Sequence, residues 1–379
     1  MPNTINLISL YSPEMLDEIF VRESVTGILE NQAGFPLRPS NVNAKTVFIP
    51  EMIMTGLGDY GRNTGYLDGD IEINWLPYTC EMDRGRAFRF DSQDDAETAG
   101  GLAGKIIPEY ERAHVIPEVD AYRLSKLAGL AKTVVLETIS ANEIINKLAL
   151  ADEVLENEEV GLEKTILFVS TEVNRLIKQT NELSKRLTQE DYKAGDLSLK
   201  IRTFDGRPIV VVPKPRFKSN YVFGTDGFDP VANAADINFM VVHLNAALPF
   251  KKHQNIKIIT PELNQDRDGW KFLYRIYHDI FTTKNKTAGI YVNRKAKALT
   301  VTFVDAHATA SGTLATPQAF VEGTALALTQ NTGTNSNSGL AFKGWALTQA
   351  LATAGTVKYL DKASITITEN ISLYAVWAA

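Results

Sequence analysis

The segment from Gly56 to Gly61 has a spacing that could cradle a phosphate group. Its glycines match the pattern G-x-G-x-x-G that follows a strand in dinucleotide-binding proteins. Such a site also needs a helix directly after the glycines, because the helix N-terminus holds the pyrophosphate. The residues that follow, Arg62 to Gly69, include two more glycines and cannot form that helix. We therefore predict a flexible hairpin tip and no bound cofactor.

The densest group of carboxylates runs from Asp91 to Glu97 and could in principle bind a metal ion. The alternating Asp-x-Asp-x-Asp-Gly spacing of a calcium-binding loop is missing, however. Acidic residues near a serine are also typical of a helix start, where they face the positive end of the helix dipole. We favour that reading, with Ser92 as the capping residue and Asp95 three positions later, and we predict no metal site.

The five histidines are too scattered to indicate a catalytic or metal site, and no pair has metal-ligand spacing. His278 and Asp279 could form a catalytic dyad, but adjacent residues on a strand point to opposite faces. We therefore expect His278 to be a structural histidine with its hydrogen bonds satisfied. The sequence contains no G-x-S-x-G elbow, no Walker loop and no H-E-x-x-H motif. We predict a protein that is not an enzyme.

Composition narrows the class further. The 379 residues carry a formal net charge of −6, so tight binding to a polyphosphate over the whole surface is disfavoured. Cys80 is the single cysteine, which excludes an internal disulfide and suits a reducing cytoplasm. No stretch of eighteen apolar residues and no secretory signal is present, so we expect no membrane span.

The composition changes abruptly near Thr300. From Thr300 to Ala379 the sequence has four acidic and three basic residues, and it is rich in threonine and alanine. Most of the charged residues precede this point. We place a domain boundary in the basic connector from Asn293 to Lys297.

Residues 45–90 predict an extended β arm. Lys45 to Met54 has strand character, Gly56 to Gly69 forms the tip, and Ile71 to Trp75 alternates apolar and polar residues. Ala87 to Phe90 extends the β character. An isolated two-stranded ribbon is marginally stable in water, so we expect this arm to lie on another surface.

The helix predicted most clearly spans residues 113–131. Its apolar residues fall in one arc at helical spacing, with Pro117 at a kink or a first turn. Asp120 and Arg123 lie inside that arc, three positions apart, so we expect them to be buried and to pair with each other.

The other elements that we expect give a mixed α+β pattern without a regular repeat. Helices are expected at 12–32, Ala141–Asn157 and Thr171–Leu187, and strands at Thr165–Ser170, Ile209–Val212, Phe239–His243, Ile256–Ile259, Trp270–Phe281 and Ala288–Val292.

Three blocks of sequence resemble a tailed-bacteriophage major capsid protein over about residues 10–292. They are Tyr78–Phe88 followed by Asp91–Glu97, Val115–Arg123, and Asn264–Phe272 continuing through Tyr277–Asp279. The resemblance implies the HK-ninety-seven-like capsid fold. Its parts would be an N-terminal arm (1–44), an extended loop (45–92), a peripheral domain built on a spine helix (93–135 and 237–293) and an axial domain (136–236).

The same resemblance implies a structural role and a set of partners. Several hundred copies would form hexamers and pentamers of an icosahedral shell, which encloses double-stranded DNA without sequence-specific binding. Assembly would take place in the host bacterial cytoplasm. Only about 44 residues precede the extended loop, so we expect a separate scaffolding protein, and a portal. Within the matching blocks we expect six residues to serve in assembly: Asp83, Arg84, Arg86, Asp120, Arg123 and Trp270.

Residues 299–379 resemble the internalin-type B repeat, also called the Listeria–Bacteroides repeat, which is a small β-grasp-like module of surface proteins. The resemblance lies in Leu299–Phe303, Glu322–Thr324, Phe342–Trp345 and Ile365–Trp377, while Asp305–Ala310 replaces the usual glycine-rich turn. It implies an outward decoration or adhesion domain, and we expect its core to contain Phe303, Phe342, Trp345, Tyr374 and Trp377. Alternatives for the whole chain are a bacterial surface adhesin and an encapsulin-like compartment shell.

Overall fold

The computed structural model describes most of the chain. The described residues are 23–30, 38–39, 45–62, 65–92, 103–179, 187–194, 197–204, 206–266, 268–305, 314–331 and 339–378. The fold is mixed, with many strands and few helices. It divides into two compact units, and the second consists of residues 230–236, a short segment at 135–138 and everything from Arg294 onward. The boundary at Arg294 falls within the connector from Asn293 to Lys297, where the sequence analysis placed the domain boundary.

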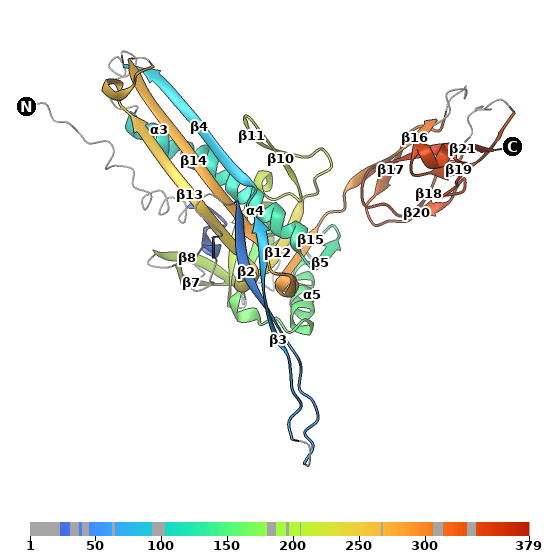
Figure 1. Cartoon of the computed structure of the whole chain (residues 1–379), viewed down its shortest axis with the longest axis horizontal. Helices are drawn as coiled ribbons and strands as arrows, with labels where there is room; N and C mark the ends of the chain where they lie inside the picture. The colour runs from blue at the N-terminus through green and yellow to red at the C-terminus, as the bar shows by residue number, and fades with distance from the viewer. Residues whose placement is uncertain are drawn as a thin grey trace, which may run out of the picture. The chain divides into compact units, whose positions relative to one another are not determined.

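The arm is an antiparallel ribbon in the first unit. Strand β2 (Thr46–Met54) pairs with β3 (Ile71–Thr79) along their whole lengths, and β1 (Arg38–Pro39) adds a short third strand at Val47 and Phe48. Figure 1 shows β2 and β3 running side by side to the tip. The positions of the two strands agree with the sequence prediction, and residues 56–62 and 65–69 lie between them, as expected of the tip.

A second antiparallel ribbon is covered by a long helical run. Strand β14 (Gly269–Phe281) lies between β13 (Leu248–Ile259) and β4 (Met82–Asp91), and α3 and α4 lie along these strands in Figure 1. The apolar cluster between the layers joins Phe272, Tyr274 and Ile276 to Ile116 and Val119.

The helical run is longer than predicted. It consists of α3 (Ala103–Tyr110), a π-helical segment (Glu111–Val115) and α4 (Ile116–Leu130), whereas we expected a helix from residue 113. Pro117 lies in the first turn of α4, directly after the π-helical segment. Because proline has no N–H and its ring clashes with the preceding turn, the wider π spacing lets the helix continue past it.

The largest sheet among the described residues has seven strands in the order β5-β15-β12-β6-β9-β8-β7. Its strands are β5 (Thr133–Leu136), β15 (Ile290–Arg294), β12 (Ile237–His243), β6 (Thr165–Ser170), β9 (Arg207–Val212), β8 (Leu197–Phe204) and β7 (Leu187–Ala194). Helices α5 (Ile144–Asn157) and α6 (Thr171–Gln179) complete it, together with a small hairpin of β10 (Tyr221–Gly224) and β11 (Gly227–Pro230). Its core includes Phe168, Met240 and Leu124.

Several predicted boundaries were wrong. Leu187 starts a strand rather than ending a helix, Ile256–Ile259 is only the end of the longer β13, and β15 starts at Ile290. Of the helix expected at 12–32, only residues 23–30 are described, and there Gly27–Leu29 forms a 3-10 turn. The helix start expected after Ser92 lies outside the described residues.

The second unit contains a four-stranded sheet in the order β17-β16-β21-β19. These strands are β17 (Gln318–Val321), β16 (Ala298–Asp305), β21 (Ile371–Ala378) and β19 (Ala341–Ala346). The first and last strands of the four, β16 and β21, are parallel neighbours in the middle of the sheet. The short helix α7 (Gln349–Thr353) packs on β21, and β18 (Leu326–Ala327) pairs with β20 (Ser364–Ile365). Among the described residues of the whole chain, no helix is long and apolar enough to cross a membrane.

Candidate functional site

One face of the β2–β3 arm is a continuous apolar stripe. Residues directly opposite each other on antiparallel strands share a face, and Met52 pairs with Ile73 while Met54 pairs with Ile71. Trp75, two positions beyond Ile73, extends the same face. These five side chains are 39–69% exposed, and soluble proteins rarely leave such a contiguous apolar face open. The stripe is therefore a candidate interaction surface.

The opposite face of the arm has a different character. Glu51, Glu72 and Asn74 lie on it, together with Ile53, which pairs with Glu72. The amide of Asn74 donates to Glu72 over 2.9 Å, so part of this face satisfies its own polar groups. The arm thus has one apolar face and one mainly polar face along its outer half.

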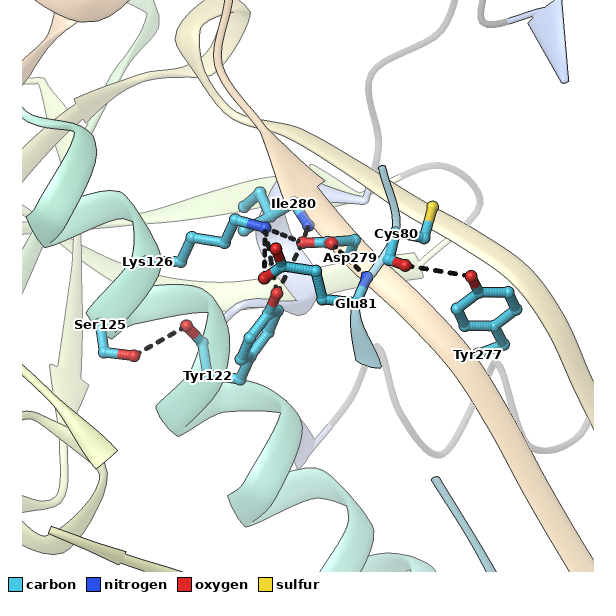
Figure 2. Close-up of polar contacts among 8 residues, drawn as sticks. All are labelled: Cys80, Glu81, Tyr122, Ser125, Lys126, Tyr277, Asp279 and Ile280. Atoms are coloured by element: carbon cyan, nitrogen blue, oxygen red, sulfur yellow. Dashed lines mark hydrogen bonds and ion pairs between the residues drawn. The ribbon is translucent and has the colours of Figure 1, made fainter. Parts of the chain in front are cut away.

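A buried carboxylate anchors the base of the arm, as Figure 2 shows. The Asp279 side chain is fully buried, and it accepts hydrogen bonds from the Glu81 backbone N–H (3.0 Å) and the Tyr122 hydroxyl (2.9 Å). Lys126 donates to the same carboxylate over 2.6 Å and also contacts the Tyr122 hydroxyl. One side chain on β14 therefore joins the end of the arm to helix α4.

Burial sets the protonation states of the groups around Asp279, which anchors the arm. Burial raises the pKa of Tyr122, and the negative charge and hydrogen bond of Asp279 raise it further. Burial, followed by the charge of Asp279, raises the pKa of the Cys80 thiol to about 11. Both groups stay neutral near pH 7, so the negative charge of Asp279 faces the Lys126 ammonium and neutral donors.

Asp120 and Arg123 were expected to pair with each other, but in the structure each binds a different partner. Both side chains are fully buried, as expected. Asp120 accepts from Ser24 and Thr26, with distances of 2.5 Å to the serine hydroxyl and 2.7 Å to the threonine hydroxyl. The Arg123 guanidinium instead contacts Glu30 at 2.6 Å.

Glu30 shows the effect of this contact. Burial alone would raise the pKa of its carboxyl, but the charges of Arg123 and Lys251 and the hydrogen bond from Arg123 hold that pKa below its ordinary value. Helix α4 is thus seated against residues 24–30 by two separate sets of polar contacts.

The other four expected assembly residues also have partners within the subunit. Asp83 forms an ion pair with Arg275, and Trp270 is stacked on Phe272 beside the apolar cluster under the helix. Arg84 pairs with Glu118 on α4, and Arg86 donates to the carbonyl of Thr225. The structure does not bring the six residues together into one site.

The residues expected to form the C-terminal core lie on both faces of its sheet. Phe303, Trp345 and Trp377 belong to the main buried cluster, and Phe342 packs against it. Tyr374 lies on the other face, beside Ala346, Val376 and Ala352 of α7. The reason is strand alternation, because Tyr374 and Trp377 are an odd number of positions apart on β21.

His278 and Asp279 form no dyad, although both side chains contact Tyr122. His278 packs edge-on against the Tyr122 ring, and burial lowers the pKa of its imidazole well below the ordinary value. Within the described part of the chain its Nδ1 has no hydrogen-bond partner, so the expectation of a satisfied histidine was wrong on this point. No cluster of three or more potential metal ligands occurs among the described residues.

Sequence reasoning missed the anchor around Asp279. Lys126 and Tyr122 are one helical turn apart on α4, so their proximity could have been found, but Glu81 is 198 positions from Asp279. The available signal was an aspartate inside the apolar run from Ile276 to Phe281, where an uncompensated charge would be costly.

Comparisons with known proteins give partial structural likenesses. No protein-family model and no curated protein sequence matches the chain. Solved structures from Mycobacterium phage Che8 (13% identity, TM-score 0.46) and of the cyanophage P-SCSP1u capsid (10%, 0.47) match 66% and 67% of this chain, and 85% and 84% of their own. The asymmetric unit of the mature capsid of bacteriophage PhiM1 matches 70% of this chain and 89% of its own, with 13% identity and a TM-score of 0.45. With every one of these TM-scores below 0.5, the likenesses carry no argument about function.

Proposed function

We propose that this chain is a major capsid protein, which assembles with copies of itself into an icosahedral shell of hexamers and pentamers around double-stranded DNA. The observation that carries the proposal is the exposed apolar stripe on the β2–β3 arm. The three sequence blocks that resemble tailed-phage capsid proteins support it, and the stripe supplies a physical reason for assembly.

The outer half of the arm is only marginally stable by itself. A two-stranded ribbon that leaves its apolar face in water contributes little free energy of folding to offset the entropy of ordering its residues. A second copy that covers Met52, Ile73 and Trp75 would supply the missing burial at about 25 cal/mol per Å² of apolar surface. If the arm lies on a different surface of the next copy, the contact is heterologous, and such contacts form closed rings when the rotation between copies closes.

Two isoleucines of the arm allow a matched test. Ile73 lies on the apolar stripe and Ile53 on the opposite face, yet both side chains are 54% exposed. We expect Ile73→Asp to abolish shell formation, because it buries a charge in the proposed contact. We expect Ile53→Asp, which places the charge beside Glu51 and Glu72, to leave assembly largely intact.

Light scattering and negative-stain microscopy of both purified variants would measure the outcome. Equal assembly of the two variants would remove the stripe from the proposed interface. Wild-type protein that stays near its 41.9 kDa monomer mass under all assembly conditions would contradict the shell itself. Nuclease-protected DNA inside native particles would separate a virion head from an encapsulin-like compartment.

For residues 299–379 we propose a β-grasp-like domain that protrudes outward and serves in decoration or adhesion. The parallel central pair β16–β21 with α7 packed on the sheet supports that comparison. Truncation after Asn293 is the test. Shells of normal size and heat resistance would indicate a display module, and earlier thermal disruption would indicate a clamp between neighbours. Density for the domain on the inner wall would contradict both.

A further inference from the structure

The tip of the β10–β11 hairpin is held in place by two arginines of β4. Arg84 and Arg86 are two positions apart on the strand and therefore share a face. Arg84 donates to the carbonyls of Gly224 (2.8 Å) and Gly227 (3.3 Å), and Arg86 donates to the carbonyl of Thr225 (2.5 Å). Figure 1 shows the hairpin beside β4 and α4.

Arg84 is itself fixed from the other side. Its Nε donates to Glu118 on α4 over 2.6 Å, and its Nη2 reaches the second carboxylate oxygen at 3.3 Å. A planar guanidinium offers several donors in a fixed geometry, so one arginine can bind a carboxylate and two carbonyls together. Lysine could not reproduce this arrangement.

The base of the hairpin is held independently of its tip. The Tyr221 hydroxyl donates to the carbonyl of Pro215 (2.8 Å) and accepts from the backbone N–H of Lys218 (3.0 Å). The Tyr221 ring also packs against Phe228. By contrast, no backbone hydrogen bond joins the turn Gly224–Gly227 to another segment of the described chain.

The turn also has space to move. It forms one wall of a cavity of about 470 Å³, whose other walls include Phe88, Tyr110 and His114. Added Cβ atoms at Gly224 and Gly227 would meet nothing within 4 Å, and Gly227 has a φ of 119°, a conformation that favours glycine. A tip with a glycine at each end, a fixed base and an adjacent cavity has the features of a hinged loop.

We propose that Arg84 and Arg86 are positioning residues that hold the Gly224–Gly227 turn in one of two positions, the second of which fills the cavity. The inference rests on the proposed function, because identical chains in hexamers and pentamers meet different surroundings and need an element that adapts. Breaking a hydrogen bond to a charged group shifts such an equilibrium by about tenfold or more, so neighbours in the shell can select either position.

Hydrogen exchange of the unassembled subunit tests the two arginines. Arg86→Ala is the main variant, since Arg86 is half exposed and its contacts here are to the turn. Arg84→Lys is the second variant, because it keeps the charge beside Glu118. We expect exchange at 222–229 to rise about tenfold in both, with β14 unchanged. Arg89→Ala, on the opposite face of β4, is the control and should change nothing. Unchanged exchange in both variants would overturn the proposal.

Hydrogen exchange in assembled particles tests the two positions. We expect residues 222–229 to show two populations with different rates in wild-type shells and one in free subunits. A single population in shells, at the rate of free subunits, would overturn the second position. Failure of the wild-type chain to form shells would count against the proposed function alone, because the comparison of free subunits does not need assembly.

Discussion

Two antiparallel ribbons in the described part of the chain have similar strand chemistry and opposite exposure: the ribbon of β13, β14 and β4, and the outer half of the β2–β3 arm. In the ribbon of β13, β14 and β4, the helical run covers Ile276, which is 3% exposed. In the β2–β3 arm, Ile73 is 54% exposed on a face that is equally apolar. The first ribbon finds its apolar cover within the chain. In the second, Val47 and Ile49 near the base are buried, but the outer half from Met52 to Ile73 has no such cover among the described residues. This difference supports the proposal that a second molecule covers the outer half of the arm.

We expect the largest loss of stability in the covered ribbon when a buried charge on its helix, such as Asp120, is removed. Asp120→Ala would leave Ser24, Thr26 and Arg216 without their acceptor, and removing one partner of a buried charge typically costs about 3–5 kcal/mol. Denaturant unfolding of the subunit would measure the loss. Because Arg123 contacts Glu30, adding Arg123→Met should lower stability further.

The structure and the sequence-based expectation of an Asp120–Arg123 pair predict opposite results for this double variant. If Asp120 and Arg123 neutralised each other, Asp120→Ala with Arg123→Met would recover part of the lost stability. Recovery would therefore contradict the two separate sets of contacts to residues 24–30. Glu23→Ala is a suitable control, because Glu23 forms an exposed ion pair with Arg112 that should contribute at most about 1 kcal/mol.

The anchor between the two ribbons should be nearly as sensitive. Asp279→Ala would remove the acceptor of Lys126, Tyr122 and the Glu81 N–H, and we expect a loss of about 3 kcal/mol or more. Asp279→Asn keeps the shape of the side chain and should cost less. Increased hydrogen exchange at Cys80–Met82 would show that the arm has come loose at its base, and unchanged exchange there would show that Asp279 does not anchor it.

The same substitution in each ribbon gives the most direct comparison. Ile276→Ala should destabilise the subunit by about 2–5 kcal/mol, because it leaves a cavity under the helix. Ile73→Ala should change subunit stability by no more than about 0.5 kcal/mol, because the side chain is already in water. Denaturant unfolding of monomers gives both values. Equal losses would mean that the arm is covered within its own subunit.

Sequence predicted the parts of the fold that depend on local patterns. The arm was found from alternation and a glycine-rich tip, and α4 from its apolar arc, because each signal lies within a few adjacent turns or positions. The start of the helical run was missed, since Gly104 and Pro108 both disfavour a helix at 103–110. Packing on β14 outweighs their intrinsic preferences.

The polar anchors could not be predicted in the same way. Asp279 and Lys126 are 153 positions apart, and Asp120 and Ser24 are 96 apart. Neither spacing leaves a periodic signal in the sequence. The burial of Asp120 could be inferred from its position in the apolar arc, but its partner depends on where residues 24–30 pack.

Cys80 offers the smallest and most local test, at the point where the arm joins the covered ribbon. Its side chain is 2% exposed and packs with Val47, Ile49 and Phe281. Because the thiolate is the reactive form, a pKa of about 11 instead of 9.0 lowers the thiolate fraction near pH 8 by about 100-fold. We expect iodoacetamide to alkylate the native chain at least about 100-fold more slowly than the unfolded chain.

The same shift fixes the sign of a pH effect. Between about pH 9 and 11 the unfolded chain has released the thiol proton while the folded chain keeps it, so stability falls as pH rises through this window. Below pH 9 both states hold the proton and the group has no effect. Cys80→Ala should therefore show a shallower loss of stability between pH 9 and 11, and an identical slope would contradict the shift.

Adding Leu57→Cys to that variant moves the thiol to the fully exposed tip, where alkylation should proceed at the rate of an unfolded chain. Slow alkylation there would mean that the tip is covered in the isolated subunit, and the contrast between the two ribbons would fail.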